Sequence, residues 1–312
     1  MRAEEIVTVK NEVPDLAMYQ SELAIPSASM FFGYKNTPAG MFRDKRVRQA
    51  YSMSLDRDLF AEVWYNVPDF KNQGLPVDIA WSSMVEATEF TGWWTDPKGS
   101  GLGAGAKFYQ HDVADAKKLL AAAGFPNGVD FQSTYATDNY GPEYKRQVEI
   151  IDGMARDAGF RPTPHGVLYQ TDLIPNYQSS KGDFEGTGWM LRPQSSSDPI
   201  DKFAEFFFSG SGPNFIGFDP DGSGAHKGDP VIDDAIRKGK IERDPQKRIQ
   251  LLKDMDKHAS ENMYLIRPIS GATGFTLAWP ALKNYLYFRG SRRSEEYTHW
   301  WLDQAQKPIS RA

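Results

Sequence analysis

The sequence lacks cysteine altogether over its 312 residues. Disulfides, thiolate catalysis, cysteine-ligated zinc and a lipid-modified cysteine are therefore excluded for this chain. No uninterrupted apolar run approaches the length of a membrane span, so we expect no stable membrane insertion. The first residues, Met-Arg-Ala-Glu-Glu-Ile, contain no apolar segment of the kind that secretion signals carry, so we expect no signal peptide in this chain.

An excess of positive charge is also missing. The chain has 36 basic and 41 acidic residues and a net charge of -5. Nucleic-acid-binding domains present a basic surface, so we expect no nucleic-acid partner. Aromatic residues, in contrast, are abundant, with 8 Trp, 14 Tyr and 19 Phe. Part of this set must form the core, and the remainder is available to line a binding cleft.

Motifs of catalysis and of metal binding are incomplete. The glycine cluster Gly99–Gly105 lacks the Gly-Lys-Ser/Thr ending of a phosphate loop, which favours a flexible surface loop. At Asp219–Gly224 the glycine comes too early for an EF-hand, which favours a polar turn. The five histidines are scattered without metal-binding spacing. We therefore expect no catalytic residue, no metal and no cofactor, and a binding protein rather than an enzyme.

Helix and strand signals alternate along much of the chain. Helices are predicted after the capping residues Asp44, Asp56, Asp112, Asp229 and Asp244, and over the apolar repeat from Tyr144 to Ala158. Short strands are predicted at Glu5–Val9, Asp130–Ala136, Thr163–Tyr169, Phe184–Met190, Tyr264–Ile269 and Gly274–Ala278. This alternation predicts an α/β fold. Residues 66–110 and 209–228 carry few periodic signals, which is typical of a functional loop or an irregular cover.

Two segments carry a family resemblance. Residues 42–57, Phe-Arg-Asp-Lys-Arg-Val-Arg-Gln-Ala-Tyr-Ser-Met-Ser-Leu-Asp-Arg, are similar to the signature D-x-R-V-R-Q-A-x-x-x-A-I-D-R. Residues 112–128 resemble D-x-x-K-A-K-x-L-L-x-E-A-G-Y-P-x-G, and Gly188-Trp189, Asp198-Pro199 and Asp244–Arg248 follow in the same order. The chain thus resembles family 5 of the bacterial extracellular solute-binding proteins, whose peptide and nickel binders feed ABC importers. The signature itself reads as two capped helices, so we expect it to be structural.

The resemblance implies a fold and a function. It implies a periplasmic-binding-protein-like lobe, a mixed sheet flanked by helices, plus remnants of a second lobe. We expect residues 1–34 to be a remnant of lobe I and the hinge, 35–269 to form the ligand-binding lobe II, and 270–312 to return to lobe I. Because family members are much longer, we expect a truncated chain. The implied role is periplasmic or extracellular capture of a peptide-like or other small polar solute between two lobes, for delivery to an ABC transporter permease.

The resemblance also implies a ligand site. In the peptide binders an aspartate soon after Gly-Trp pairs with the α-ammonium group of the peptide, whereas Met, Leu, Arg and Pro follow Trp189 here. We expect Arg192 either to pair with an anionic ligand group or to lie on the rim in solvent. Trp189 is expected either to line the pocket, as a stacking surface or an apolar anchor, or to be a core residue. The predicted ligand-binding set is Trp189, Met190, Arg192, Asn214 and Phe215.

The solute class and the function class both stay open at this point. A modified peptide, an oligosaccharide or an opine-like acid would each suit a polar, aromatic-rich cleft. The alternative from another class is a glycan-acting hydrolase, which requires two acids facing each other across a cleft. A further alternative is an oligosaccharide-binding or sensor module on the same fold.

Overall fold

The structure, a computed structural model, describes residues 2–24, 28–35, 37, 39–87, 92–191, 196, 198–211, 228–285 and 299–308. The chain divides into two compact units. The first unit takes in residues 1–26, 58–80 and 270–312, and the second takes in residues 27–57 and 81–269. Both units combine helices and strands, so the predicted α/β class is confirmed.

The second unit is built on a five-stranded sheet with the strand order β5–β4–β6–β2–β7. β4 runs parallel to both β5 and β6, whereas β2 runs antiparallel to β6 and β7. The sheet is therefore mixed, as the family resemblance implies. The strand bounds are β2 Ala28–Phe32, β4 Val129–Ala136, β5 Phe160–Val167, β6 Thr187–Leu191 and β7 Leu265–Ile266.

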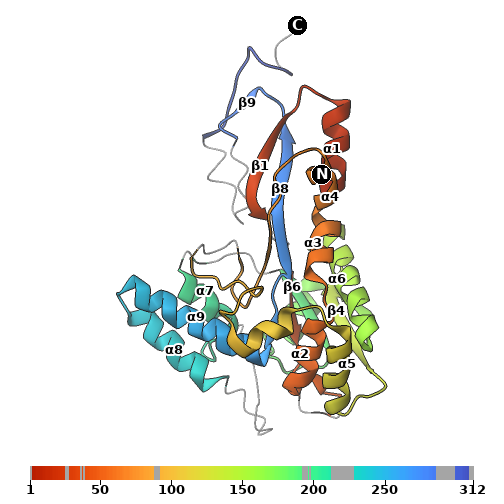
Figure 1. Ribbon diagram of the computed structural model, residues 1–312, viewed down its shortest axis with the longest axis vertical. Helices are drawn as coiled ribbons and strands as arrows, with labels where there is room; N and C mark the ends of the chain where they lie inside the picture. The colour runs from red at the N-terminus through yellow and green to blue at the C-terminus, as the bar shows by residue number, and fades with distance from the viewer. Residues whose placement is uncertain are drawn as a thin grey trace. The chain divides into compact units, whose positions relative to one another are not determined.

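Helices flank this sheet in two groups. α7, α8 and α9 lie together on one side of the second unit, and α2, α5 and α6 lie on the other (Figure 1). Five aspartates cap helices by accepting hydrogen bonds from backbone N–H groups of the first turn, as the sequence predicts for four of them. The helix bounds are α2 Lys45–Met53, α5 Val113–Ala122, α6 Pro142–Ala155, α7 Pro199–Phe207, α8 Pro230–Ile241 and α9 Pro245–Asn262.

Shorter helical turns complete the second unit, namely η1 Met41–Arg43, η2 Gly103–Tyr109, η3 Arg156–Ala158 and the wide π-type helix η4 Tyr169–Gln178. Its core between the sheet and α2 is aromatic. The ring of Phe42 lies 4.7 Å from that of Phe32 and 5.1 Å from that of Phe131, centroid to centroid. Edge-to-face and tilted contacts of this kind stabilise beyond the area that they bury.

The first unit has a three-stranded sheet in the order β1–β8–β3, formed by β1 Ala17–Ala24, β8 Ser270–Ala278 and β3 Ile79–Trp81. Its helices are α1 Ala3–Glu12, α3 Arg57–Tyr65 and α4 Val67–Asn72, and β9 Leu282–Lys283 pairs with β10 Trp301–Leu302. Ile6, Phe70 and Phe275 form a buried cluster. Residues 58–80 pack here through Phe70 and Tyr65, although the sequence places them in the ligand-binding segment 35–269.

Two local predictions are wrong. Residues Glu5–Val9 lie inside α1 rather than in a strand, because Glu5 Oε2 accepts a hydrogen bond from Arg2 N at the start of the helix and Ile6 is buried from a helical face. The run of β-branched residues favours a strand by propensity, which tertiary packing overrides. Residues 66–110, predicted to lack regular structure, contain α4, β3 and η2.

Candidate functional site

The signature segment at residues 42–57 is a structural element, as its sequence indicates. Arg48 is 1% exposed, and all three nitrogens of its guanidinium group donate hydrogen bonds to backbone carbonyls. The acceptors lie in η1, just before α2, and at the end of α9, and they are Phe42 O, Arg43 O, Asn262 O and Met263 O. Arg48 thus fastens the carboxyl end of α9 to α2.

Two further signature residues act in the same way. Gln49 Nε2 donates to Glu261 O at 2.6 Å. Arg57 is 2% exposed and donates to Ser52 O at 3.0 Å and to Tyr109 O at 2.6 Å. We call Arg48, Gln49 and Arg57 the signature cluster. Most of the hydrogen bonds of its side chains go to backbone carbonyls of the second unit, so we interpret the cluster as a scaffold.

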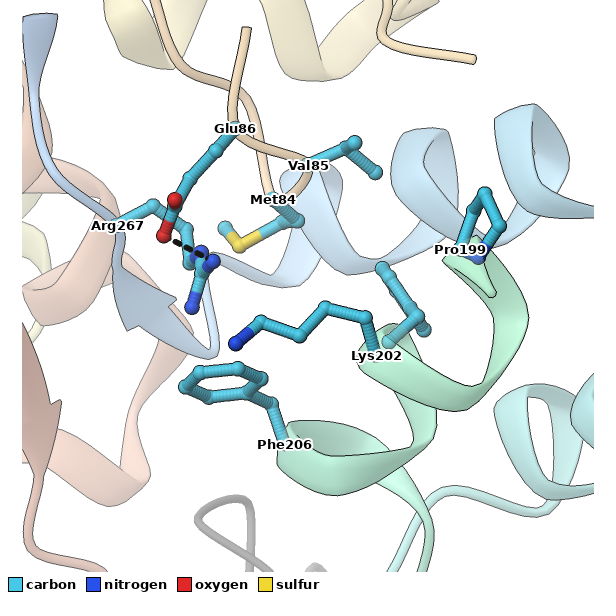
Figure 2. Close-up of a pocket in the computed structure, with 8 residues that line it drawn as sticks. Met84, Val85, Glu86, Pro199, Lys202, Phe206 and Arg267 are labelled. Atoms are coloured by element: carbon cyan, nitrogen blue, oxygen red, sulfur yellow. Dashed lines mark hydrogen bonds and ion pairs between the residues drawn. The ribbon is translucent and has the colours of Figure 1, made fainter. Parts of the chain in front are cut away.

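A second group of buried charges lies between β7, α7 and the loop after β3 (Figure 2). Arg267 forms an ion pair with Glu86, and its guanidinium carbon lies 4.1 Å from the ring centroid of Phe206. Lys202 Nζ lies 5.3 Å from the same centroid and 3.8 Å from Glu205 Oε2. Figure 2 shows both cationic groups converging near this ring. We call Glu86, Lys202, Phe206 and Arg267 the buried charge cluster.

The loop that carries Glu86 is held by a fully buried acid. Asp256, in α9, accepts hydrogen bonds from Ser83 Oγ at 2.7 Å and from Met84 N at 2.9 Å. Burial raises the pKa of Asp256 to about 7, because the charged form is costly away from water. The space beside the cluster, about 10 Å³, is comparable to one water molecule. This region therefore has no room for an organic solute.

The carboxyl ends of β4, β5 and β6 offer a more open site. Because these three strands run parallel, their carboxyl ends meet at one edge of the sheet, where ligands bind in open α/β folds. Thr137 follows β4, Leu168 follows β5, and β6 ends at Leu191.

A pocket of about 540 Å³ lies at this edge, within the range of roughly 300–1,000 Å³ that is typical of small-molecule sites. η4 follows β5 at once and supplies part of the wall, and wide helical turns of its kind are frequent at functional sites. We call this site the edge pocket. Its lining residues are Thr137, His165, Gly166, Val167, Leu168, Asp172, Asn176 and Tyr177.

Three polar groups of the edge pocket are open to a ligand. Asp172 Oδ2 accepts from Leu168 N at 3.2 Å and from Thr171 Oγ1 at 3.0 Å, which fixes the carboxylate. His165 Nδ1 lies 3.2 Å from Thr134 Oγ1. Asp172 Oδ1, His165 Nε2 and the amide of Asn176 make no hydrogen bond to any residue that the structure describes.

Tyrosines fix the chain beside the edge pocket. The ring of Tyr140 lies 4.9 Å from that of Tyr144 and 5.2 Å from that of Tyr169, centroid to centroid. Tyr144 is buried, and its hydroxyl donates to Trp189 O at 2.5 Å. Tyr169 N donates to Asp138 Oδ1 at 2.8 Å. These contacts tie together the segments that leave β4 and β5.

The residues predicted from the sequence lie differently. Trp189 is fully buried in β6, where its indole N–H donates to Ser133 Oγ at 2.9 Å, and Met190 is also fully buried. Their burial is explained by the core alone, and their contact with a ligand stays a prediction. Arg192, Asn214 and Phe215 lie outside the described residues. Sequence reasoning missed His165, Asp172 and Asn176, although their place around the end of a predicted strand was a usable signal.

Two kinds of site do not occur in the part of the chain that the structure describes. No group of three or more His, Asp or Glu side chains there is arranged to hold a metal ion. No helix within the same residues is both long and apolar enough to span a membrane.

No curated protein matches the chain. The structure resembles the periplasmic binding protein DppA from Helicobacter pylori in complex with the peptide STSA, with a TM-score of 0.65, 15% identity, and coverage of 96% of this chain and 51% of that one. It also resembles the putative peptide-binding protein AppA from Clostridium difficile, with a TM-score of 0.66 and 16% identity. That match covers 97% of this chain and 56% of AppA. A third similar structure is AgaA from A. tumefaciens R10 in complex with agropinic acid, with a TM-score of 0.65 and 15% identity. That match covers 97% of this chain and 55% of AgaA.

These likenesses, at such low identity, show the fold, and the chain spans about half the length of each structure. The family model for bacterial extracellular solute-binding proteins, family 5 Middle, matches residues 3–214, which is more than half of the chain. The match includes the signature cluster and the edge pocket. The resemblance stated from the sequence motifs is thereby confirmed. The chain belongs to family 5 of the bacterial extracellular solute-binding proteins.

Proposed function

We propose that this chain is part of the solute-binding component of an ABC import system. It captures a small polar organic or peptide-like solute outside the cytoplasm, in the periplasm or the extracellular space, and delivers it to a membrane permease. The observation that carries the proposal is the edge pocket, an open site with three unused polar groups on the sheet of a family 5 chain. The second unit is the ligand-binding one.

The names of similar proteins support a transport role but leave the solute open. DppA is described as associated with an ABC transporter and holds a peptide, whereas AgaA holds agropinic acid. One fold thus carries chemically different ligands, so the solute has to be inferred from the site rather than from the fold.

The lining of the edge pocket fits reversible binding better than hydrolysis. A glycosidase places two carboxyl groups on either side of the scissile bond. Among the described lining residues, Asp172 supplies the one carboxylate. A single fixed carboxylate can hold a ligand, and the described lining contains no second acid to share the protonation steps. We therefore propose a binding protein without catalysis.

Ligand-dependent thermal unfolding tests the proposal. The purified chain is unfolded with a peptide mixture, neutral oligosaccharides, amino-acid-derived acids and nickel, each at a large excess. A solute that binds the folded chain alone stabilises it by about 2.7 kcal/mol at a hundredfold excess over Kd, which raises the midpoint measurably. The bound solute is then recovered and analysed by mass spectrometry. We expect it unchanged, whereas a hydrolysed product, or no midpoint shift with any class, would contradict the proposal.

A further inference from the structure

We infer that the edge pocket binds a neutral, hydroxyl-rich group, such as a sugar ring or a polyol. This inference rests on the proposed function and names the class of solute. The pocket combines a carboxylate, an amide and an imidazole within one lining, and each has an atom that no described residue bonds.

The hydrogen-bonding capacity of the lining runs in both directions. Asp172 Oδ1 can only accept when the acid is ionised, whereas the amide of Asn176 donates through its nitrogen and accepts through its oxygen. His165 Nε2 donates or accepts according to the tautomer, since the hydroxyl of Thr134 beside Nδ1 suits both. Thr137 Oγ1 donates to Val167 O at 3.1 Å, and the hydroxyl oxygen keeps its capacity to accept. A hydroxyl group donates and accepts, and it therefore matches every one of these atoms.

Charged and apolar ligand groups match less well. An ammonium group can pair with Asp172, but it only donates, so it cannot accept from the N–H groups of Asn176. A carboxylate only accepts, and it is repelled by Asp172 because the described lining contains neither lysine nor arginine. A purely apolar group would strip water from Asp172 and Asn176 without replacing their hydrogen bonds.

The walls of the pocket also suit a ring that is polar at its rim and apolar on its faces. Leu168 is 51% exposed, although it is a large apolar residue, and the Tyr177 ring is half-buried. Both line the same pocket as Asp172 and Asn176. Apolar surface of this kind packs against the C–H face of a sugar ring, while the hydroxyl groups reach the polar atoms.

Isothermal titration calorimetry of the full chain tests this inference. The ligands are neutral trisaccharides, tripeptides, an amino sugar and a dicarboxylic acid. Two variants each change a single pocket group. Asp172→Asn replaces the carboxylate by an uncharged amide of nearly the same shape, and Asn176→Ala removes the amide of Asn176. The matched controls are Asp157→Asn, an exposed acid outside the pocket, and Gln170→Ala, an exposed amide on η4 that does not line it. Circular dichroism confirms that all four variants fold.

We expect a neutral trisaccharide to bind, and Asn176→Ala to weaken it roughly tenfold or more, because the variant removes the hydrogen bonds of the amide. Asp172→Asn should also weaken it, because a charge-assisted hydrogen bond is replaced by a neutral one. The two controls should bind as the unsubstituted chain does. Binding of a peptide, the amino sugar or the acid in place of neutral sugars would overturn the inference and leave the proposed function standing. Sugar binding that the pocket variants do not change would also overturn it. Failure of every ligand class would count against the proposed function itself.

Discussion

The signature cluster and the edge pocket use the same kinds of polar side chain in opposite ways. In the signature cluster, Arg48 is buried and every nitrogen of its guanidinium group is bonded to a backbone carbonyl. In the edge pocket, one carboxylate oxygen of Asp172 accepts hydrogen bonds from Leu168 N and Thr171 Oγ1, and the other oxygen has no partner among the described residues. Buried polar groups are mostly bonded within the protein, whereas a polar group at an open pocket is available to a ligand.

The largest effect is expected for Arg48→Met. The substitution removes the guanidinium group that donates to four backbone carbonyls in the interior, including Asn262 O and Phe42 O. Because hydrogen bonds to charged groups contribute about 1.5–3 kcal/mol each, we expect the free energy of unfolding to fall by about 5 kcal/mol or more. Urea unfolding followed by circular dichroism measures the change.

Arg46→Met is the matched control for Arg48→Met. Arg46 lies on the same helix, but its side chain is 45% exposed and pairs with Asp44 at the surface. Exposed pairs contribute about 0–1 kcal/mol, so the unfolding midpoint should move little. Equal losses in the two variants would mean that burial does not distinguish scaffold arginines from surface ones.

The next largest effect concerns the buried charge cluster. Arg267→Met leaves the carboxylate of Glu86 buried without its ion-pair partner, which is expected to cost about 3–5 kcal/mol of unfolding free energy. The double variant Glu86→Gln/Arg267→Met removes both charges and should recover much of that loss. A double variant that is less stable than Arg267→Met alone would show that Glu86 is stabilised by other groups.

A smaller, pH-dependent effect is expected for Asp256→Asn. Burial raises the pKa of Asp256 from 3.8 to about 7, so the folded chain holds this proton more tightly than the unfolded chain. The stability that the group contributes is then fully present below about pH 4 and is lost as the pH rises to about 7. The asparagine variant lacks this loss. Urea unfolding at intervals between pH 4 and 8 should therefore show that the free energy of unfolding of the unsubstituted chain falls, relative to that of the variant, as the pH rises. Asp254→Asn, which changes an exposed acid of the same helix, is the matched control.

Much of the fold could be predicted from local signals. Aspartates before Pro230 and Pro245 cap α8 and α9, and the apolar repeat after Tyr144 forms α6. β2 was missed because its five residues are all buried, and a continuous apolar run has no period that separates a strand from a helix. η4 was missed because its π-type hydrogen bonding leaves no familiar spacing in the sequence.

The candidate site was harder to predict than the fold. The motif Gly188-Trp189 drew attention to β6, where the tryptophan proves to be buried with its N–H satisfied. His165 and Asp172 belong to no motif, and they share one pocket because η4 begins where β5 ends, whereas Thr137 joins them because β4 is the parallel neighbour of β5. Strand order is a property of the whole chain, and local patterns do not encode it.

The smallest effect on stability is expected for Asp172→Asn, the same change of acid to amide as in Asp256→Asn. Asp172 is half-exposed, and the variant keeps an oxygen for Leu168 N and the hydroxyl of Thr171. We expect the free energy of unfolding to change by no more than about 0.5 kcal/mol, as for most surface substitutions, while ligand binding is weakened. Urea unfolding without ligand, beside calorimetry with it, measures both quantities on one sample. A loss of stability as large as that of a buried variant would place Asp172 in the scaffold and remove the distinction between the two regions.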